Sequence, residues 1–197
     1  MSDRPPIVVG ITGASGAPYA VRLLQELTAA KRPISLIVSS YGFRLLAAEV
    51  GIESIDALRS AVGKKGWDSC VTSYANDDRG ARPASGSALT SGMIICPCSM
   101  GTLSAISVGA SRSLIERAAD VTLKERRKLI LVPRETPLSA IHLSNMLRLT
   151  RAGAVIMPAA PGFYHRPKQI TDLVDFVVAR VLDQLGVEQK LVKRWEG

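Results

Sequence analysis

The sequence predicts an α/β fold in which a parallel sheet is covered by helices on both faces. Short, wholly apolar runs of strand length recur along the chain. Segments with apolar residues at helical spacing lie between these runs. Strands that are apolar on both sides and alternate with helices are typical of a parallel sheet buried between two helical layers.

The expected strands are five buried runs and one weaker segment. The first run ends at a glycine-containing turn, and the runs beginning at 93, 129 and 154 are each followed by proline. The weaker segment, 69–74, lies within a stretch rich in Gly, Ser, Asp and Pro (63–91), which we expect to be mostly loop. In chain order the expected strands are 7–11, 34–38, 69–74, 93–96, 129–132 and 154–157.

The expected helices lie between and after these strands. Pro18 is compatible with the first helix, because the first helical turn does not use its missing N–H. Thr136 is a suitable helix start before Pro137, and Gly153 and Gly186 are suitable helix ends. The expected helical segments are about 17–27, 41–61, 102–108, 114–126, 137–151 and 171–185.

The chain has 197 residues, of which 47% are hydrophobic. This length fits one domain over residues 1–197, with a short tail from about 187 to 197. No apolar run reaches the roughly 18 residues that span a bilayer, and the N-terminus lacks a secretory pattern. We therefore expect a cytoplasmic protein that does not bind membranes.

Metal and nucleic-acid binding are not expected. The three cysteines, with His142 and His165, match no zinc-ligand spacing, and so few histidines also argue against a Ser-His-Asp hydrolase. Cys96 and Cys98 are expected to be small core residues rather than nucleophiles. The net charge is +8, but basic and acidic residues are interleaved and aromatics make up 5% of the chain. No basic stripe with stacking residues results.

The turn after the first strand contains Gly10, Gly13 and Gly16. This spacing matches the dinucleotide fingerprint poorly, and the lysine of a nucleotide-hydrolysing loop is missing. The backbone N–H groups and the Ser15 hydroxyl would suit an anion or a polar ring edge at a helix N-terminus. An ordinary tight turn explains the segment equally well.

Other candidate residues could have either a ligand-binding or a structural role. Ser99 and Thr102 either line a pocket or cap a helix. Arg117 and Lys124, on one face of a helix and roughly 10 Å apart, either hold an anion or form surface ion pairs through Asp120.

Three residues later in the chain are also candidates. Glu135 directly follows a buried strand, and this is the best acid/base position in the chain. On local grounds Arg180, at the edge of an apolar helix face, is more typical of a snorkelling surface residue, whereas Tyr164 is compatible with either loop packing or ligand contact.

Five segments together resemble the flavin prenyltransferase family, the UbiX-type proteins. They are "GITGASGAPYAVRLLQEL", "PASGS", "CPCSMGTLSAI", "LIERAADVTLKERRKLILVPRETPLS" and "PAAPGFYHRP". The resemblance implies a flavodoxin-like, Rossmann-type three-layer sandwich that binds FMN and assembles into a homo-oligomer, commonly a dodecamer, with active sites between subunits. It also implies transfer of a dimethylallyl group from dimethylallyl monophosphate to reduced FMN, at N5 and then C6, without a metal. The prenylated FMN would serve a UbiD-type decarboxylase.

The resemblance also implies roles for individual residues. Glu135, Ser15, Glu49 and Lys124 match active-site positions. The implied FMN contacts are Gly13, Ala14, Ser15, Ser39, Ser99, Met100, Gly101, Thr102 and Arg134. The implied prenyl-phosphate contacts are Tyr164, Arg180, Arg117 and Lys124, and Trp195 matches an aromatic residue near the prenyl chain.

The sequence departs from the family pattern at two places. Many relatives have a tryptophan just before PASGS, whereas residues 76–82 contain no aromatic residue. Met100 stands where some relatives have threonine. Two alternative functions are a flavin-dependent cysteine decarboxylase and a non-catalytic FMN-binding protein. The decarboxylases have a PASANT-like loop and an early histidine base, whereas no histidine precedes His142 here.

Overall fold

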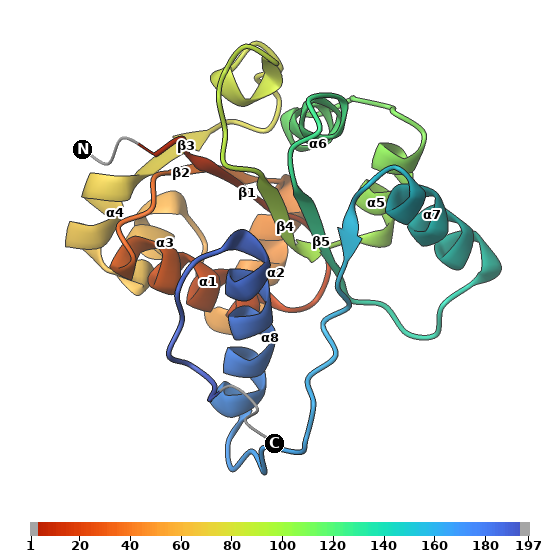
Figure 1. The fold of residues 1–197 in the computed structure, drawn as a ribbon. Helices are drawn as coiled ribbons and strands as arrows, with labels where there is room; N and C mark the ends of the chain where they lie inside the picture. The colour runs from red at the N-terminus through yellow and green to blue at the C-terminus, as the bar shows by residue number, and fades with distance from the viewer. Residues whose placement is uncertain (1–3, 194–197) are drawn as a thin grey trace.

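The computed structural model describes residues 4–193. Six parallel strands form one sheet in the order β3-β2-β1-β4-β5-β6 (Figure 1). The chain reverses its direction of travel across the sheet between β1 and β4, and this switch point is where doubly wound sheets bind ligands. The strands are β1 (Ile7–Ile11), β2 (Ile34–Val38), β3 (Val71–Tyr74), β4 (Met93–Cys98), β5 (Leu129–Pro133) and β6 (Val155–Ile156).

The central strands are apolar on both faces because both faces are covered. Every residue of β1, β2, β4 and β5 is buried. Val9 of β1, for example, is paired with Leu36 of β2 on one side and Ile94 of β4 on the other. The predicted sandwich with a buried parallel sheet is therefore confirmed.

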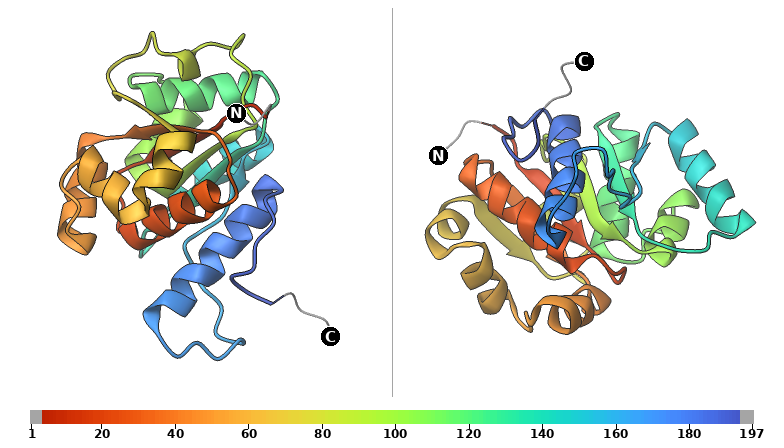
Figure 2. Two further views of the ribbon diagram at one scale, coloured as in Figure 1. Left: turned by 90° about the vertical axis from the view of Figure 1, so that its left-hand side faces the viewer. Right: turned by 90° about the horizontal axis from the view of Figure 1, so that it is seen from below.

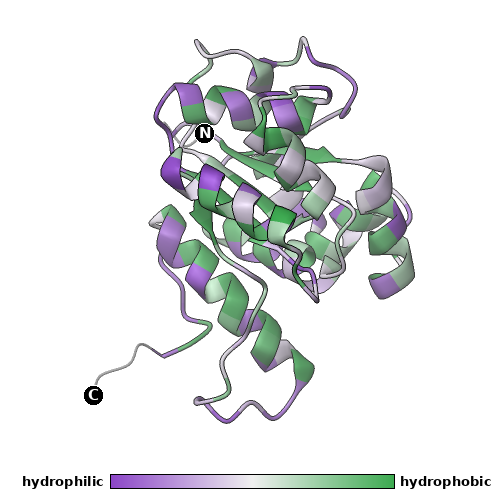
Figure 3. Cartoon of the chain, turned by 90° about the vertical axis from the view of Figure 1, so that its right-hand side faces the viewer, coloured by the Kyte–Doolittle hydropathy of each residue, from purple (hydrophilic) through white to green (hydrophobic). Residues whose placement is uncertain are grey.

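Two helical layers cover the sheet (Figures 1 and 2). Helices α1 to α4 and α8 pack on one face, whereas α5, α6 and α7 pack on the other. The helices are α1 (Ala17–Ala29), α2 (Ser40–Val50), α3 (Ile55–Val62), α4 (Lys64–Cys70), α5 (Met100–Ser107), α6 (Leu114–Lys124), α7 (Ala140–Arg151) and α8 (Ile170–Leu185). Because each helix has one face on the sheet and one in solvent, its sequence mixes hydrophobic and hydrophilic residues, as the colours of the helices in Figure 3 show.

Three local predictions differ from the structure. Thr136 does not start a helix; α7 begins at Ala140, because the Ser139 hydroxyl accepts the His142 N–H and the His142 ring accepts the Ser139 N–H. The helix expected over 41–61 is two helices, since Gly51 at φ 68° ends α2. Helix α4 was not predicted; buried Trp67 anchors an otherwise polar segment to the core.

Candidate functional site

A pocket of about 310 Å³ opens at the carboxyl ends of the strands, beside the switch point. Residues that follow β1, β2, β3 and β4 line it, together with the start of α6. Its lining consists mainly of hydroxyl, amide and backbone groups, which suit a polar ligand with several acceptors. The lining residues are Thr12, Gly13, Ser39, Ser40, Tyr41, Asn76, Ser99, Thr102, Ser113, Ile115 and Glu116.

The N-termini of α2, α5 and α6 all meet this pocket. Each begins after a serine whose hydroxyl accepts a backbone N–H of the first turn: Ser39 from Gly42, Ser99 from Thr102 and Ser113 from Glu116. Ser99 therefore does cap a helix, and it also lines the pocket. Helix N-termini carry partial positive charge, so their convergence favours an anionic ligand.

The first turn of α1 already holds an anion, the side chain of Glu49. Oε2 of Glu49 accepts the Gly16 N–H at 2.9 Å and the Ala17 N–H at 2.8 Å. The sequence left a ligand site and an ordinary tight turn equally open for this segment; in the structure an anion does bind there, and the chain itself supplies it. Gly13 lets the start of α2 lie close to this turn, because a Cβ there would lie 2.5 Å from Cβ of Tyr41.

Hydrogen bonds stabilise Glu49 in its charged form. Burial by itself raises the pKa of this carboxyl group, but bonds from the Gly16 N–H, the Ser15 hydroxyl and the Ala17 N–H lower it, and so does the charge of Arg134. The net effect is a lowered pKa. Ser15, Glu49 and Arg134 thus form one electrostatic unit.

We expect Glu49→Gln to lower the free energy of unfolding by about 1 kcal/mol at pH 7, since solvent screens this exposed group and the loss resembles that of a helix cap. A depressed pKa stabilises the fold above the unfolded value near 4.5 and loses that effect as the pH falls through the folded pKa. The difference from wild type should therefore shrink below about pH 4.5. Urea unfolding of both proteins from pH 7 to pH 3.5 measures it.

The control is Glu53→Gln, which removes an exposed carboxylate from the loop after α2. It should leave stability unchanged throughout the same pH range. A Glu49→Gln difference that stayed constant with pH would contradict the proposed stabilisation of the Glu49 carboxylate.

Arg134 and Glu135 follow β5, next to β4 in the sheet. Nε of Arg134 is buried and, within residues 4–193, has no hydrogen-bond partner. A bound ligand or a water molecule can supply the acceptor for this N–H. Glu135 is exposed, and its Oε1 accepts the N–H of Thr136 at 3.2 Å.

Arg117 and Lys124 lie on α6, which begins at the pocket and packs along β4 and β5. Arg117 lies at the pocket end and pairs with Asp120 at 2.9 Å, as expected for a surface ion pair. Lys124 pairs with Glu125 instead. Nine residues, or about 14 Å along the helix, separate it from Ile115 in the pocket.

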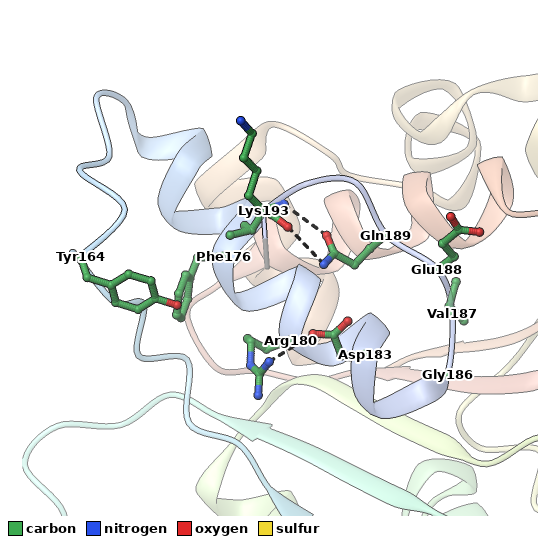
Figure 4. Close-up of a pocket in the computed structure, with 10 residues that line it drawn as sticks. Tyr164, Phe176, Arg180, Asp183, Gly186, Val187, Glu188, Gln189 and Lys193 are labelled. Atoms are coloured by element: carbon green, nitrogen blue, oxygen red, sulfur yellow. Dashed lines mark hydrogen bonds and ion pairs between the residues drawn. The ribbon is translucent and has the colours of Figure 1, made fainter. Parts of the chain in front are cut away.

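Tyr164 and Arg180 line a second cavity, of about 610 Å³, which α8 forms with the segments before and after it (Figure 4). Nη1 of Arg180 pairs with Asp183 at 3.2 Å. The Tyr164 ring meets the Phe176 ring edge-on, with the centroids 5.7 Å apart. Trp195 lies outside the described residues.

The predicted residues therefore form separate groups within one copy of the chain. The implied FMN contacts that follow β1, β2 and β4 gather around the switch point. Lys124 lies near the start of β5, on the face covered by α6, whereas Arg180 lies on α8, which covers the other face. The sheet separates these two cations.

The cysteine prediction is confirmed. Cys96 and Cys98 are fully buried in β4, and burial raises the pKa of the Cys96 thiol to about 12. Neither is a nucleophile in this state. Among residues 4–193, no three His, Cys, Asp or Glu side chains are grouped as metal ligands, and no helix is long and apolar enough to cross a bilayer.

Seven of the eleven residues that line the pocket were not predicted as site residues: Thr12, Ser40, Tyr41, Asn76, Ser113, Ile115 and Glu116. Asn76 follows β3, and its amide oxygen accepts the Ile115 N–H at 3.2 Å. Its position after a predicted strand could have indicated from the sequence that it lies at the site. Glu116 accepts the Arg112 N–H at 2.7 Å, and Tyr41 stands 63% exposed at the rim. No local pattern marks these last two.

Comparison with known proteins places the chain among flavoproteins. The family model described as Flavoprotein matches residues 1–182. A flavin prenyltransferase UbiX of Pseudomonas aeruginosa is 48% identical, with 99% of this chain and 96% of that protein covered.

Two crystal structures share the fold. One is AnUbiX (PadA1) in complex with FMN and dimethylallyl pyrophosphate, at 41% identity and a TM-score of 0.91, with 98% of both chains covered. The other is a dodecameric FMN-dependent UbiX-like decarboxylase from Escherichia coli O157:H7, at 44% identity and a TM-score of 0.90, with 98% and 100% covered. This chain therefore belongs to the Flavoprotein family and, within it, to the UbiX-type flavin prenyltransferases.

Proposed function

We propose that this protein transfers a dimethylallyl group from dimethylallyl monophosphate to reduced FMN, first to N5 and then to C6. The observation that carries the proposal is the pocket at the switch point, where three helix N-termini meet in a chain 48% identical to a flavin prenyltransferase. FMN supplies the electron-rich nitrogen and carbon that accept the group. The chain binds both reactants, orients them and excludes water.

The pocket residues fit FMN in their chemistry. Hydroxyl and backbone groups suit the ring edge and ribityl chain, and the helix N-termini suit the phosphate. The side chain of Met100 is buried in the core, so its backbone is what faces a ligand, and a methionine there is compatible with binding. We assign FMN binding to Gly13, Ala14, Ser15, Ser39, Ser99, Met100, Gly101, Thr102 and Arg134.

The donor needs fixed positive charge. A phosphate monoester is a poor leaving group, and cations together with hydrogen-bond donors can stabilise the negative charge that develops as it departs. We assign this role to Arg117, Lys124, Arg180 and Tyr164, and the apolar wall beside the prenyl chain to Trp195.

Glu135 would act as the general acid or base of the reaction. Its exposed carboxyl group follows the strand next to the switch point, where it can protonate the departing phosphate or assist removal of the C6 proton. Ser15 and Glu49 would orient the reacting ring from the β1–α1 turn.

Homo-oligomers would complete the site, because one copy leaves Lys124 and Arg180 on opposite faces of its sheet. Exposed apolar side chains offer contact surfaces, among them Ile141, Phe163 and Ile170 at 70%, 68% and 76% exposure. We infer a dodecamer in the cytoplasm that delivers its product to a UbiD-type decarboxylase.

One assay separates the candidate functions. The protein is incubated anaerobically with reduced FMN and either dimethylallyl monophosphate or dimethylallyl diphosphate, and the flavin is analysed by mass spectrometry. A five-carbon adduct is the expected result. A parallel incubation contains oxidised FMN and a peptide that ends in cysteine; oxidative decarboxylation of that cysteine, with FMN as the electron acceptor, would favour the decarboxylase. FMN binding without turnover in either incubation would favour a binding protein.

A further inference from the structure

The loop of residues 82–90 packs on α6 through buried Ala84, and the guanidinium group of Arg127 bonds the rest of the loop to the end of that helix. Nη2 of Arg127 donates to the Gly86 carbonyl at 2.8 Å, and Nη1 donates to the Ala88 carbonyl at 2.8 Å. Nη1 also lies 3.4 Å from the Thr90 hydroxyl. Because the guanidinium group is planar and bonds two carbonyl groups, it fixes the orientation of the loop as well as its distance from α6. The single ammonium group of a lysine would not fix the orientation.

Arg127 is itself held firmly. Its backbone N–H donates to the Thr122 carbonyl at 2.9 Å, which closes the end of α6, while Arg126 turns the chain with φ 56°. Thr122 is buried, and its hydroxyl donates to the Ala118 carbonyl at 2.7 Å. The guanidinium group therefore projects from a rigid helix end, three residues after Lys124.

The fastened loop passes directly against Lys124. A Cβ added to Gly86 would lie 2.7 Å from Nζ of Lys124 and would also contact the Glu125 carboxylate. Lys124 remains half-exposed and pairs with Glu125. The backbone at Gly86 thus limits where the Lys124 ammonium group can lie. Arg127 fixes the position of that backbone through its bond to the Gly86 carbonyl.

We propose that Arg127 and Gly86 are positioning residues for Lys124. Arg127 holds the loop in place, and the missing side chain of Gly86 leaves the ammonium group its present position. The inference rests on the proposed function, in which Lys124 binds the donor phosphate. Without Arg127 the part of the loop from Gly86 to Thr90 would lose its hydrogen bonds to the end of α6, and Lys124 would lose the fixed geometry that the departing phosphate requires.

The test is a double-mutant cycle on the oligomeric, FMN-loaded protein. Adduct formation is measured against dimethylallyl monophosphate concentration for the wild type, Arg127→Gln, Lys124→Ala and the double variant. We expect Arg127→Gln to raise KM for the donor about tenfold, with the dissociation constant of FMN unchanged within twofold. In the Lys124→Ala background the same change should add less than about twofold, because residues acting through each other are not additive.

Gly86→Ala provides a second variant that leaves the fold intact, because the atoms it displaces are the ends of flexible side chains. It should also raise KM. Arg126→Gln is the matched control, since it removes an exposed positive charge one residue away from Arg127. Guanidinium chloride should partly restore Arg127→Ala but not Lys124→Ala.

Hydrogen exchange gives a readout independent of turnover. Arg127→Gln should speed amide exchange in residues 85–90 relative to Arg126→Gln. Unchanged exchange in that loop, or equal KM effects of Arg127→Gln with and without Lys124, would overturn the inference. A wild-type protein that forms no adduct would refute the proposed function instead, and the exchange result would still decide whether Arg127 holds the loop.

Discussion

Mixed oligomers of two slow variants are expected to recover activity. Lys124→Ala and Arg180→Gln should each slow adduct formation by about 10²-fold, as loss of a charge-stabilising group does. When the two variants are dissociated together and reassembled, some sites should combine an intact Lys124 from one copy with an intact Arg180 from another. Those sites should regain turnover, whereas separately reassembled variants should not.

The structure gives the reason. Lys124 lies on α6 and Arg180 on α8, and these helices pack on opposite faces of the sheet. The whole thickness of the sheet therefore lies between the two helices. A dimethylallyl phosphate is too short to contact both within one copy. If reassembly restored nothing, the two cations would serve different steps or one of them would lie outside the site.

The control for this experiment is a pair of variants on the same helix. Arg117→Ala and Lys124→Ala, both on α6, should complement each other poorly if they serve the same neighbouring pocket. Size-exclusion chromatography with light scattering checks that the mixtures reassemble.

Glu135→Gln is expected to slow adduct formation by about 10²-fold while leaving FMN affinity unchanged within twofold. The amide is of the same size but cannot carry the proton, and general acid–base groups contribute about this much. Stopped-flow measurement of the flavin absorbance under anaerobic conditions gives the rate, and fluorescence titration gives the affinity.

Because Glu135 is exposed, its replacement by Gln should not change the stability of the fold. Its side chain contacts the N–H of Thr136 and is otherwise open, so the fold should not respond. Glu53→Gln, another exposed carboxylate, serves as the control and should leave the rate unchanged. Loss of FMN from the Glu135 variant would show that this residue binds the cofactor and does not transfer a proton.

Much of the fold was predictable because it depends on local pattern. Strands buried on both faces are apolar at every position, and the apolar spacing of α1 places Leu23, Leu24 and Leu27 on its buried side. The boundaries were less predictable. Thr136 and Ser139 are both acceptable helix caps in sequence, and the bond between Ser139 and His142 decides where α7 starts.

The sequence by itself determined the alternation of strands and helices, the burial of Cys96 and Cys98, and, through its resemblance to known proteins, the family. The tertiary structure decided that Glu49 occupies the start of α1, that Asn76 and Glu116 enter the pocket, and that the sheet separates Lys124 from Arg180. The reason is physical. Periodicity records which face of an element is buried, whereas contacts between residues tens of positions apart depend on how the elements pack.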